Sequence, residues 1–146
     1  MTARHLAQRA HDMGFLVGAV LALAVGLFAT VIGLDRDRAF YPTVLIVIAS
    51  YYGLFAVISG SSVVLALESI AILGCLAASI AGFKRSLWLV VLALAAHGLY
   101  DYVHGQLIAN AGVPLWWPAF CMAFDLVAAA YLAWLLSRSN IRAVAT

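Results

Sequence analysis

Charged side chains are scarce in this sequence: Asp, Glu, Lys and Arg make up 10% of its 146 residues, and hydrophobic residues make up 66%. The mean hydropathy is +1.08. A soluble domain carries about 25% charged residues, so this composition excludes a soluble fold. With 8 basic and 6 acidic residues, the chain also lacks the basic surface that nucleic-acid binding requires. The composition is that of an integral membrane protein.

Cysteine is rare, and a cleavable leader is not indicated. The two cysteines, Cys75 and Cys121, lie in different apolar segments and at different expected depths, so we predict no disulfide between them. The first apolar run follows a basic arm, as in a signal peptide, but it is too long for one. No small-residue cleavage site follows it before Asp35. We therefore expect the first run to be a retained transmembrane helix.

The apolar runs lack the alternation of apolar and polar residues that marks β-strands, and their continuity favours helices. Each run is long enough to cross about 30 Å of hydrocarbon at about 1.5 Å of rise per residue. The sequence predicts an all-α polytopic protein, one domain over residues 1–146 formed by a bundle of five transmembrane helices. The predicted spans are residues 14–34, 41–59, 61–83, 86–104 and 115–136.

Small residues recur every four positions in two of the predicted spans. They are Gly14, Gly18, Ala22, Gly26 and Thr30 in the first span and Gly74, Ala78 and Gly82 in the third. Such stripes let another helix approach closely, so we interpret them as packing surfaces. They can also serve a homo-oligomer or a larger membrane complex.

Basic residues are distributed unequally between the two predicted sides of the membrane. One side holds Arg4 and Arg9, and the other holds Arg36, Arg38, Lys84, Arg85, Arg138 and Arg142. The positive-inside rule then predicts an outside N-terminus and a cytoplasmic C-terminus, in a protein of the bacterial inner-membrane type. We expect the charged loop of residues 35–38 to be solvated, with loosely paired charges. The N-terminal arm, with His5, His11 and Asp12, is expected to be frayed.

Ionisable residues inside the apolar spans are the main functional indication. His97, Asp101 and His104 are spaced i, i+4 and i+7, which places them within roughly 60° of one helix face. On the predicted topology, Glu68, His97 and Asp125 all lie roughly 10–15 Å below the outer boundary. Buried charges in a bilayer are costly and mark functional sites, so we predict a polar cavity near the outer face.

Metal binding is the sharpest interpretation of this cluster, because imidazole and carboxylate ligate ions such as Zn²⁺ or iron. The candidate ligands are Glu68, His97, Asp101, His104 and Asp125. His104 lies about 10.5 Å along the helix from His97, too far for both to bind one ion. We expect His104 to bind a second ion, to lie at the entry point of the site or to support the ligand residues. Cys121, one turn from Asp125, can add a soft ligand or simply pack. Three aromatic residues, Tyr51, Tyr100 and Trp117, are the candidates for cofactor contact.

Several functions fit these residues. The leading prediction is a small enzyme that acts on a lipophilic substrate, with Glu68, His97, Asp101 and Asp125 as catalytic residues. It would use either a divalent ion or acid–base chemistry between a buried acid and an imidazole. A proton-coupled or metal-ion carrier uses the same groups. Haem or quinone ligation is a weaker fit, because only one span carries histidines. An accessory subunit of a larger membrane complex would use the small-residue stripes instead.

Overall fold

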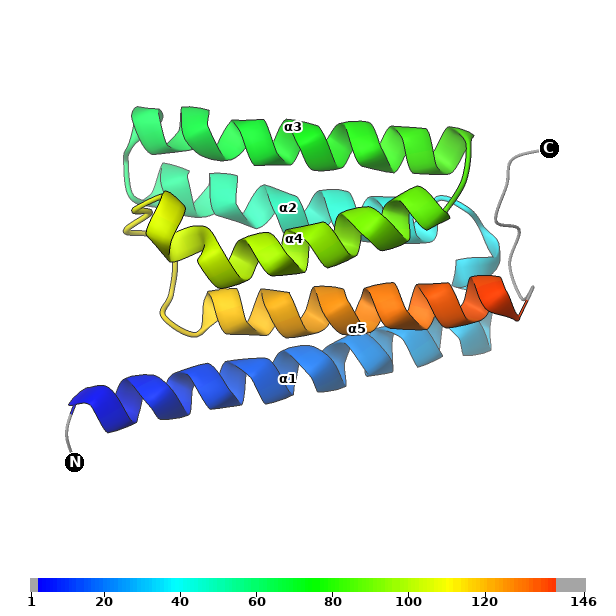
Figure 1. The fold of residues 1–146 in the computed structure, drawn as a ribbon, viewed down its shortest axis with the longest axis horizontal. Coiled ribbons are helices and arrows are strands. Elements are labelled where there is room, and N and C mark those ends of the chain that lie inside the picture. The colour runs from blue at the N-terminus through cyan, green and yellow to red at the C-terminus, as the bar shows by residue number, and fades with distance from the viewer. Residues whose placement is uncertain (1–2, 139–146) are drawn as a thin grey trace.

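The chain folds into five long helices that run alongside one another (Figure 1). The structure is a computed structural model and describes residues 3–138. The elements are α1 (Ala3–Ile32), the short 3-10 helix η1 (Leu34–Arg36), α2 (Phe40–Ile58), α3 (Ser62–Lys84), α4 (Trp88–Leu107) and α5 (Trp117–Ser137). The all-α prediction is confirmed. The ends of α2 to α5 lie within three residues of the predicted spans, the largest difference being Leu107 against residue 104.

The first helix differs most from the prediction. It begins at Ala3, well before Gly14, so the arm with His5, His11 and Asp12 is helical and the expectation of a frayed arm is wrong. Most of its described side chains are exposed, and Gln8 donates a hydrogen bond to Asp12 one turn later, over 2.9 Å. The arm is made of good helix formers such as Ala, Leu, Gln and Arg, which extend an existing helix at little cost.

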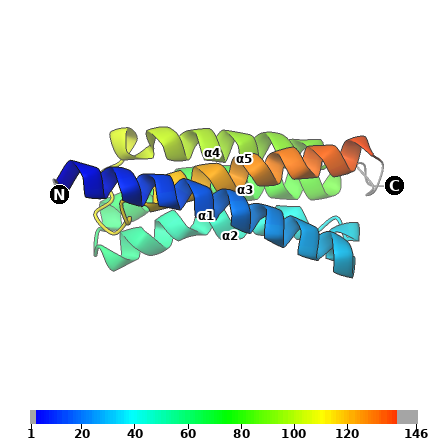
Figure 2. The same ribbon diagram turned by 90° about the horizontal axis from the view of Figure 1, so that it is seen from below.

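Four of the described helices are long and apolar enough to cross a membrane: α1 from His5, α2, α3 and α5. This identifies the chain as an integral membrane protein. Five spans were predicted, and α4 does not meet the same criterion of length and composition. Its two histidines and its aspartate, His97, Asp101 and His104, are all buried. The helix contacts α2, α3 and α5, so these groups lie inside the bundle (Figures 1 and 2).

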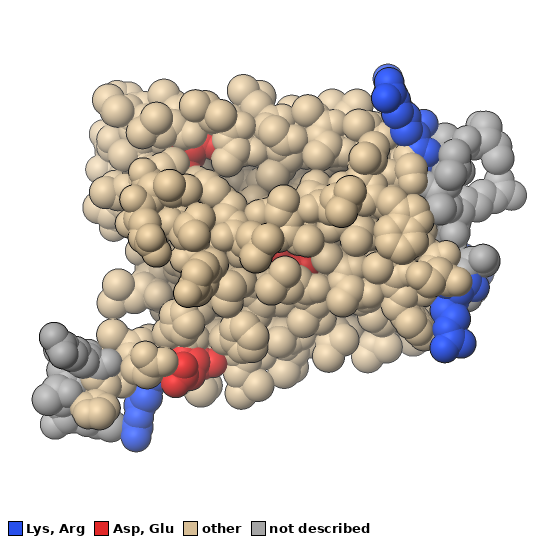
Figure 3. Space-filling model, in the orientation of Figure 1, with Lys and Arg blue, Asp and Glu red and all other residues tan. Residues whose placement is uncertain are grey.

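On the face drawn in Figure 3, Lys and Arg lie at the two ends of the bundle, and the flank between them shows only small areas of Asp or Glu. The N-terminus of α1 and the α2–α3 and α4–α5 connections share one end (Figure 1). The other end holds the C-termini of α1, α3 and α5, with Arg36, Lys84 and Arg138. The loops group as the sequence predicted. Arg142 and the side chain of Arg4, which entered the charge count, lie outside the described residues.

The loop after α1 is more ordered than predicted. Asp35 is only 3% exposed, and its carboxylate hydrogen-bonds with the Thr30 hydroxyl, which lies 2.9 Å from the Tyr131 hydroxyl. Arg38 donates to the carbonyl oxygens of Gly82 and Phe83 at the end of α3. The expectation of a solvated, loosely paired loop is therefore wrong for Asp35, which bonds to α1, and for Arg38, which caps the end of α3, whereas Arg36 and Asp37 are exposed.

The small residues of α1 pack against α5, as the first stripe predicted. A Cβ atom on Gly18 would lie 2.2 Å from the Phe120 carbonyl oxygen, and one on Gly14 would lie 2.6 Å from that of Trp116. This stripe is therefore used within the chain. In α3 the stripe is divided, because a Cβ on Gly82 would meet Val90 of α4 at 2.3 Å, whereas one on Gly74 would meet nothing within 4 Å.

Gly18→Ala is expected to lower the free energy of unfolding by about 1–3 kcal/mol, because the added methyl group meets backbone that a rotamer change cannot move. The measurement is denaturation of the purified protein in mixed detergent micelles. Gly74→Ala is the matched control and should be neutral, since its Cβ enters open space. Equal stability of the two variants would contradict the close α1–α5 contact.

Candidate functional site

Three buried residues from two helices converge in the middle of the bundle. The Nδ1 atom of His97 lies 2.6 Å from Oδ2 of Asp125 on α5 and 3.5 Å from Oδ2 of Asp101, one turn further along α4. One ligand atom from each of the three residues lies within 4.8 Å of those of the other two. Gly98 allows this approach, because a Cβ there would lie 3.2 Å from the Asp125 Cβ. We call His97, Asp101 and Asp125 the triad.

The triad is short of hydrogen-bond partners. His97 is 4% exposed, Asp101 1% and Asp125 0%. Both carboxylate oxygens of Asp101 and Oδ1 of Asp125 are buried and have no hydrogen-bond partner among the described residues. Leaving buried polar atoms unpaired is costly, and leaving a buried charge uncompensated costs much more. The arrangement therefore needs protons or a cation to balance it.

The spacing of the triad suits a single metal ion. Metal bonds of about 2.0–2.2 Å place the ligand atoms of one ion roughly 3–4 Å apart. The triad atoms lie between 2.6 and 4.8 Å of one another, so small side-chain adjustments bring all three into range. One imidazole and two carboxylates are ligands for zinc, iron or manganese. The buried triad can thus hold a metal ion.

A second polar cluster lies one to two turns away along α4, toward the α4–α5 loop. Glu68 of α3 is fully buried, and its Oε1 lies 2.8 Å from the His104 Nε2. Tyr100 donates to its Oε2 over 3.2 Å, and the Asn110 side chain donates to Oε1 over 2.9 Å. Both carboxylate oxygens of Glu68 are therefore paired. This cluster is hydrogen-bonded within itself, in contrast to the triad.

Tyr52 of α2 lies between the two clusters. Its ring stacks on the His104 ring with centroids 4.0 Å apart, and its centroid is 6.2 Å from that of His97. Its hydroxyl interacts with Asp101, although neither group forms a hydrogen bond of ordinary geometry. Its carbonyl oxygen accepts from Asn110 over 3.1 Å. Tyr52 is thus the α2 residue that packs against both clusters.

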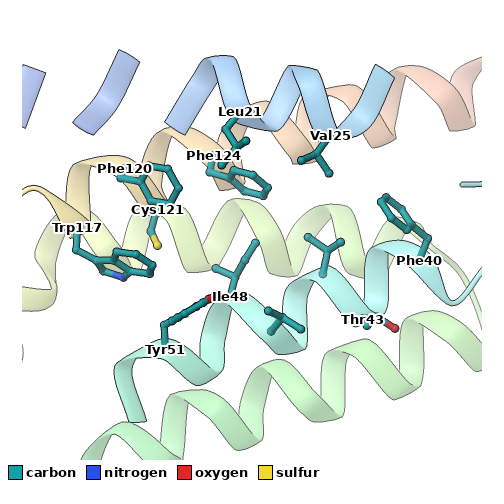
Figure 4. A pocket seen from close by; sticks show the side chains of 12 residues that line it. Leu21, Val25, Phe40, Thr43, Ile48, Tyr51, Trp117, Phe120, Cys121 and Phe124 are labelled. Carbon is teal, nitrogen blue, oxygen red and sulfur yellow. The ribbon is translucent and has the colours of Figure 1, made fainter. Parts of the chain in front are cut away.

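An apolar cavity of about 490 Å³ lies between α1, α2 and α5. Figure 4 shows Phe120 and Phe124 of α5 facing Ile48 of α2 across it. Tyr51 and Trp117, two of the predicted cofactor-contact residues, line this cavity with ring centroids 4.9 Å apart. Cys121 lines it as well and is 2% exposed. The cysteines are both free, as predicted.

The structure divides the residues that the sequence grouped together. His97, Asp101 and Asp125 converge as a triad, Glu68 and His104 pair with each other beside Tyr100, and Tyr51 and Trp117 lie in the apolar cavity. Sequence reasoning missed Asn110. Its position in a Gly- and Pro-containing loop between two apolar runs is typical of a turn. Its Oδ1 does accept from the Gly112 N–H, while its Nδ2 turns inward to Glu68.

The fold and the triad define a class: a helical membrane protein with a buried His97–Asp101–Asp125 cluster that can hold a metal ion. Comparison of the chain with protein-family models, with curated proteins and with solved structures finds no match.

Proposed function

We propose that the protein is a membrane-embedded enzyme that binds a divalent cation at the triad and acts on a lipophilic substrate. The observation that carries this proposal is the set of three carboxylate oxygens that accept no hydrogen bond of ordinary geometry, beside an imidazole nitrogen in the middle of the bundle. A purely structural cluster would resemble that of Glu68, whose two oxygens are both paired. Unpaired buried acids are instead typical of sites that act on a cation or a proton.

The number of ligands favours a catalytic ion over a structural one. Structural zinc sites are closed by four protein ligands, whereas catalytic sites have three and keep a position open. The triad offers three: His97 through Nδ1 and one carboxylate oxygen each from Asp101 and Asp125. Zinc and iron both suit this set. When bound, such an ion would supply Lewis-acid activation of a carbonyl or of water.

In this proposal Glu68 and His104 position the triad and do not ligate the ion. The Glu68 carboxylate joins α3 to Tyr100 and His104, which flank Asp101 on α4. It also anchors Asn110 in the loop that leads into α5, the helix that carries Asp125. We therefore propose that Glu68 and His104 are not metal ligands and that they hold α4 in position relative to α3.

Acid–base catalysis without metal is the second candidate, and the 2.6 Å contact between His97 Nδ1 and Asp125 favours it. A carboxylate that accepts from Nδ1–H fixes the imidazole tautomer and leaves Nε2 as a base. The same contact would serve a proton-coupled carrier. The metal content of the purified protein distinguishes acid–base catalysis and the proton-coupled carrier from the metal-dependent enzyme.

We also propose that all five helices lie within the bilayer, with the N-terminus outside and the C-terminus in the cytoplasm of a bacterial inner membrane. The basic residues Arg36, Lys84 and Arg138 gather at one end of the bundle, which supports this orientation. The two acids of the triad are then enclosed by the helices around α4, because Asp101 is 1% exposed and Asp125 is 0% exposed.

The test is elemental analysis of protein purified in detergent, followed by equilibration with Zn²⁺ or Fe²⁺. Wild type should hold about one equivalent, and the His97→Ala and Asp125→Asn variants should each hold less than about a tenth of that. Asp35→Asn is the matched control, because Asp35 is also a buried acid but bonds to Thr30, so its metal content should equal that of wild type. Metal retained by both triad variants would refute this site. A wild type that binds neither ion would leave the acid–base candidate.

A further inference from the structure

A groove of about 350 Å³ lies between α3 and α4, where the packing residues are too small to fill the space. Its walls are Ala71, Gly74 and Ala78 of α3 with Ala93 and Ala96 of α4. Outer residues of α3 such as Ile70 and Leu73 are 70% and 61% exposed, so this helix faces lipid. The groove therefore opens sideways into the hydrocarbon layer, where an apolar chain can enter it.

His97 and Tyr100 also line this groove, and they are its polar groups. His97 is 4% exposed and uses Nδ1 toward the triad, while its Nε2 has no hydrogen-bond partner among residues 3–138. Because Nε2 is not fully buried, a ligand in the groove can reach it and form a hydrogen bond with it. The groove thus connects the lipid phase to the imidazole of the triad.

The two ring nitrogens together indicate the chemistry of that ligand. A histidine that ligates a metal through Nδ1 carries its proton on Nε2 and donates it to an acceptor. The matching group in the groove is a carbonyl oxygen. The residues that line the groove include no Lys, Arg, Asp or Glu, so nothing there compensates a charged headgroup. A neutral lipid is therefore favoured over a free fatty acid.

We propose that the α3–α4 groove binds the single hydrocarbon chain of a neutral acyl ester, with the ester carbonyl accepting a hydrogen bond from His97 Nε2. This inference rests on the proposed function, because the Nε2 proton follows from a cation on Nδ1. It names the substrate class of the same site: a lipid ester whose carbonyl is brought beside the triad.

Cys75 provides a native reporter, because it lines the groove and is partly exposed. In a Cys121→Ala background it is the sole thiol. The experiment measures the rate of its alkylation by N-ethylmaleimide in dodecyl maltoside, a detergent without a carbonyl group. The zinc content of the same sample is recorded. Methyl palmitate should slow the reaction about tenfold, and hexadecane, which lacks the carbonyl, should slow it about threefold or less.

Two variants locate the effect. Gly74→Leu places an apolar side chain at the groove wall, where a Cβ meets nothing within 4 Å, and it should abolish protection by the ester. Gly105→Leu is the matched control, because Gly105 is equally open but lies outside the groove, and protection should persist. His97→Phe should reduce the effect of the ester to that of hexadecane.

The outcomes separate the two proposals. Ester protection in zinc-loaded protein that Gly74→Leu removes supports the groove. Equal rates with and without methyl palmitate in zinc-loaded protein overturn the groove proposal and leave the cation site standing. Stronger protection by hexadecanol than by the ester, in protein that binds no zinc, overturns both, because Nε2 is then an acceptor and the cation is absent.

Discussion

Glu68→Ala is expected to lower the free energy of unfolding by about 3–5 kcal/mol, the largest stability loss of the variants considered for this protein. The substitution removes the acceptor shared by His104, Tyr100 and Asn110, each of which pairs with Glu68 at 3.2 Å or less. His104 is 2% exposed and Asn110 is 9% exposed, so water cannot easily replace the partner that these two residues lose. Denaturation in mixed micelles, followed by circular dichroism, measures the loss.

Glu68→Gln is the matched control for this prediction. Its amide oxygen can still accept a hydrogen bond, so the expected loss is about 1–2 kcal/mol. Glu68→Gln keeps an acceptor for the positioning hydrogen bonds, so it should retain the triad cation if it is folded at the assay temperature. Loss of the ion in folded Glu68→Gln protein would instead place Glu68 among the ligands, as the sequence had suggested.

The fold was largely predictable because the signals are local. An uninterrupted apolar run in lipid has to satisfy its own backbone, which fixes helices α2 to α5 to within a few residues. The stripe of small residues from Gly14 to Thr30 also predicted that another helix packs closely against α1, because small side chains permit a close approach. What the stripe does not specify is the partner helix. The choice of α5 depends on complementary shape around Phe120 and Tyr131.

The site was predictable only in part, for a geometric reason. Helical spacing places His97 and Asp101 on one face of α4 with no further information. Depth counting brought Asp125 to the same level, but it could not give the rotation of α3 about its axis. Glu68 consequently pairs with His104, one to two turns from the expected position. A shift of a few ångströms in the position of Glu68 along α4 is enough to change its proposed role from a metal ligand to a residue that positions the ligands.

Two polar interactions escaped prediction because they depend on tertiary contacts. Asp35 lies in a charged tetrapeptide that is typical of a solvated loop, but Thr30 and Tyr131 enclose it. Asn110 lies in a turn, and its inward amide is decided by the position of Glu68. Neither contact is indicated by a periodic pattern of residues in the sequence.

Asp101→Val is expected to stabilise the cation-free protein by about 1–3 kcal/mol while abolishing cation binding. Both carboxylate oxygens of Asp101 are buried and accept no hydrogen bond of ordinary geometry, so the side chain costs free energy that an apolar group of similar size does not. Removing it also removes one of three ligands. The measurements are unfolding in the presence of a chelator and zinc content in its absence. Opposite signs in stability and binding are characteristic of a residue retained for function.

Asp101→Asn is the control that keeps the shape and polarity of the side chain. It should bind the cation poorly and, because its amide is left as unpartnered as the acid was, gain less stability than Asp101→Val. The contrast with Glu68 carries the argument. Glu68 is hydrogen-bonded, so removing it should destabilise the fold. Asp101 accepts no hydrogen bond of ordinary geometry, so in the proposed site it should destabilise the fold when no cation is bound. If Asp101→Val destabilises the cation-free protein as strongly as Glu68→Ala does, the triad is structural and the proposed cation site is wrong.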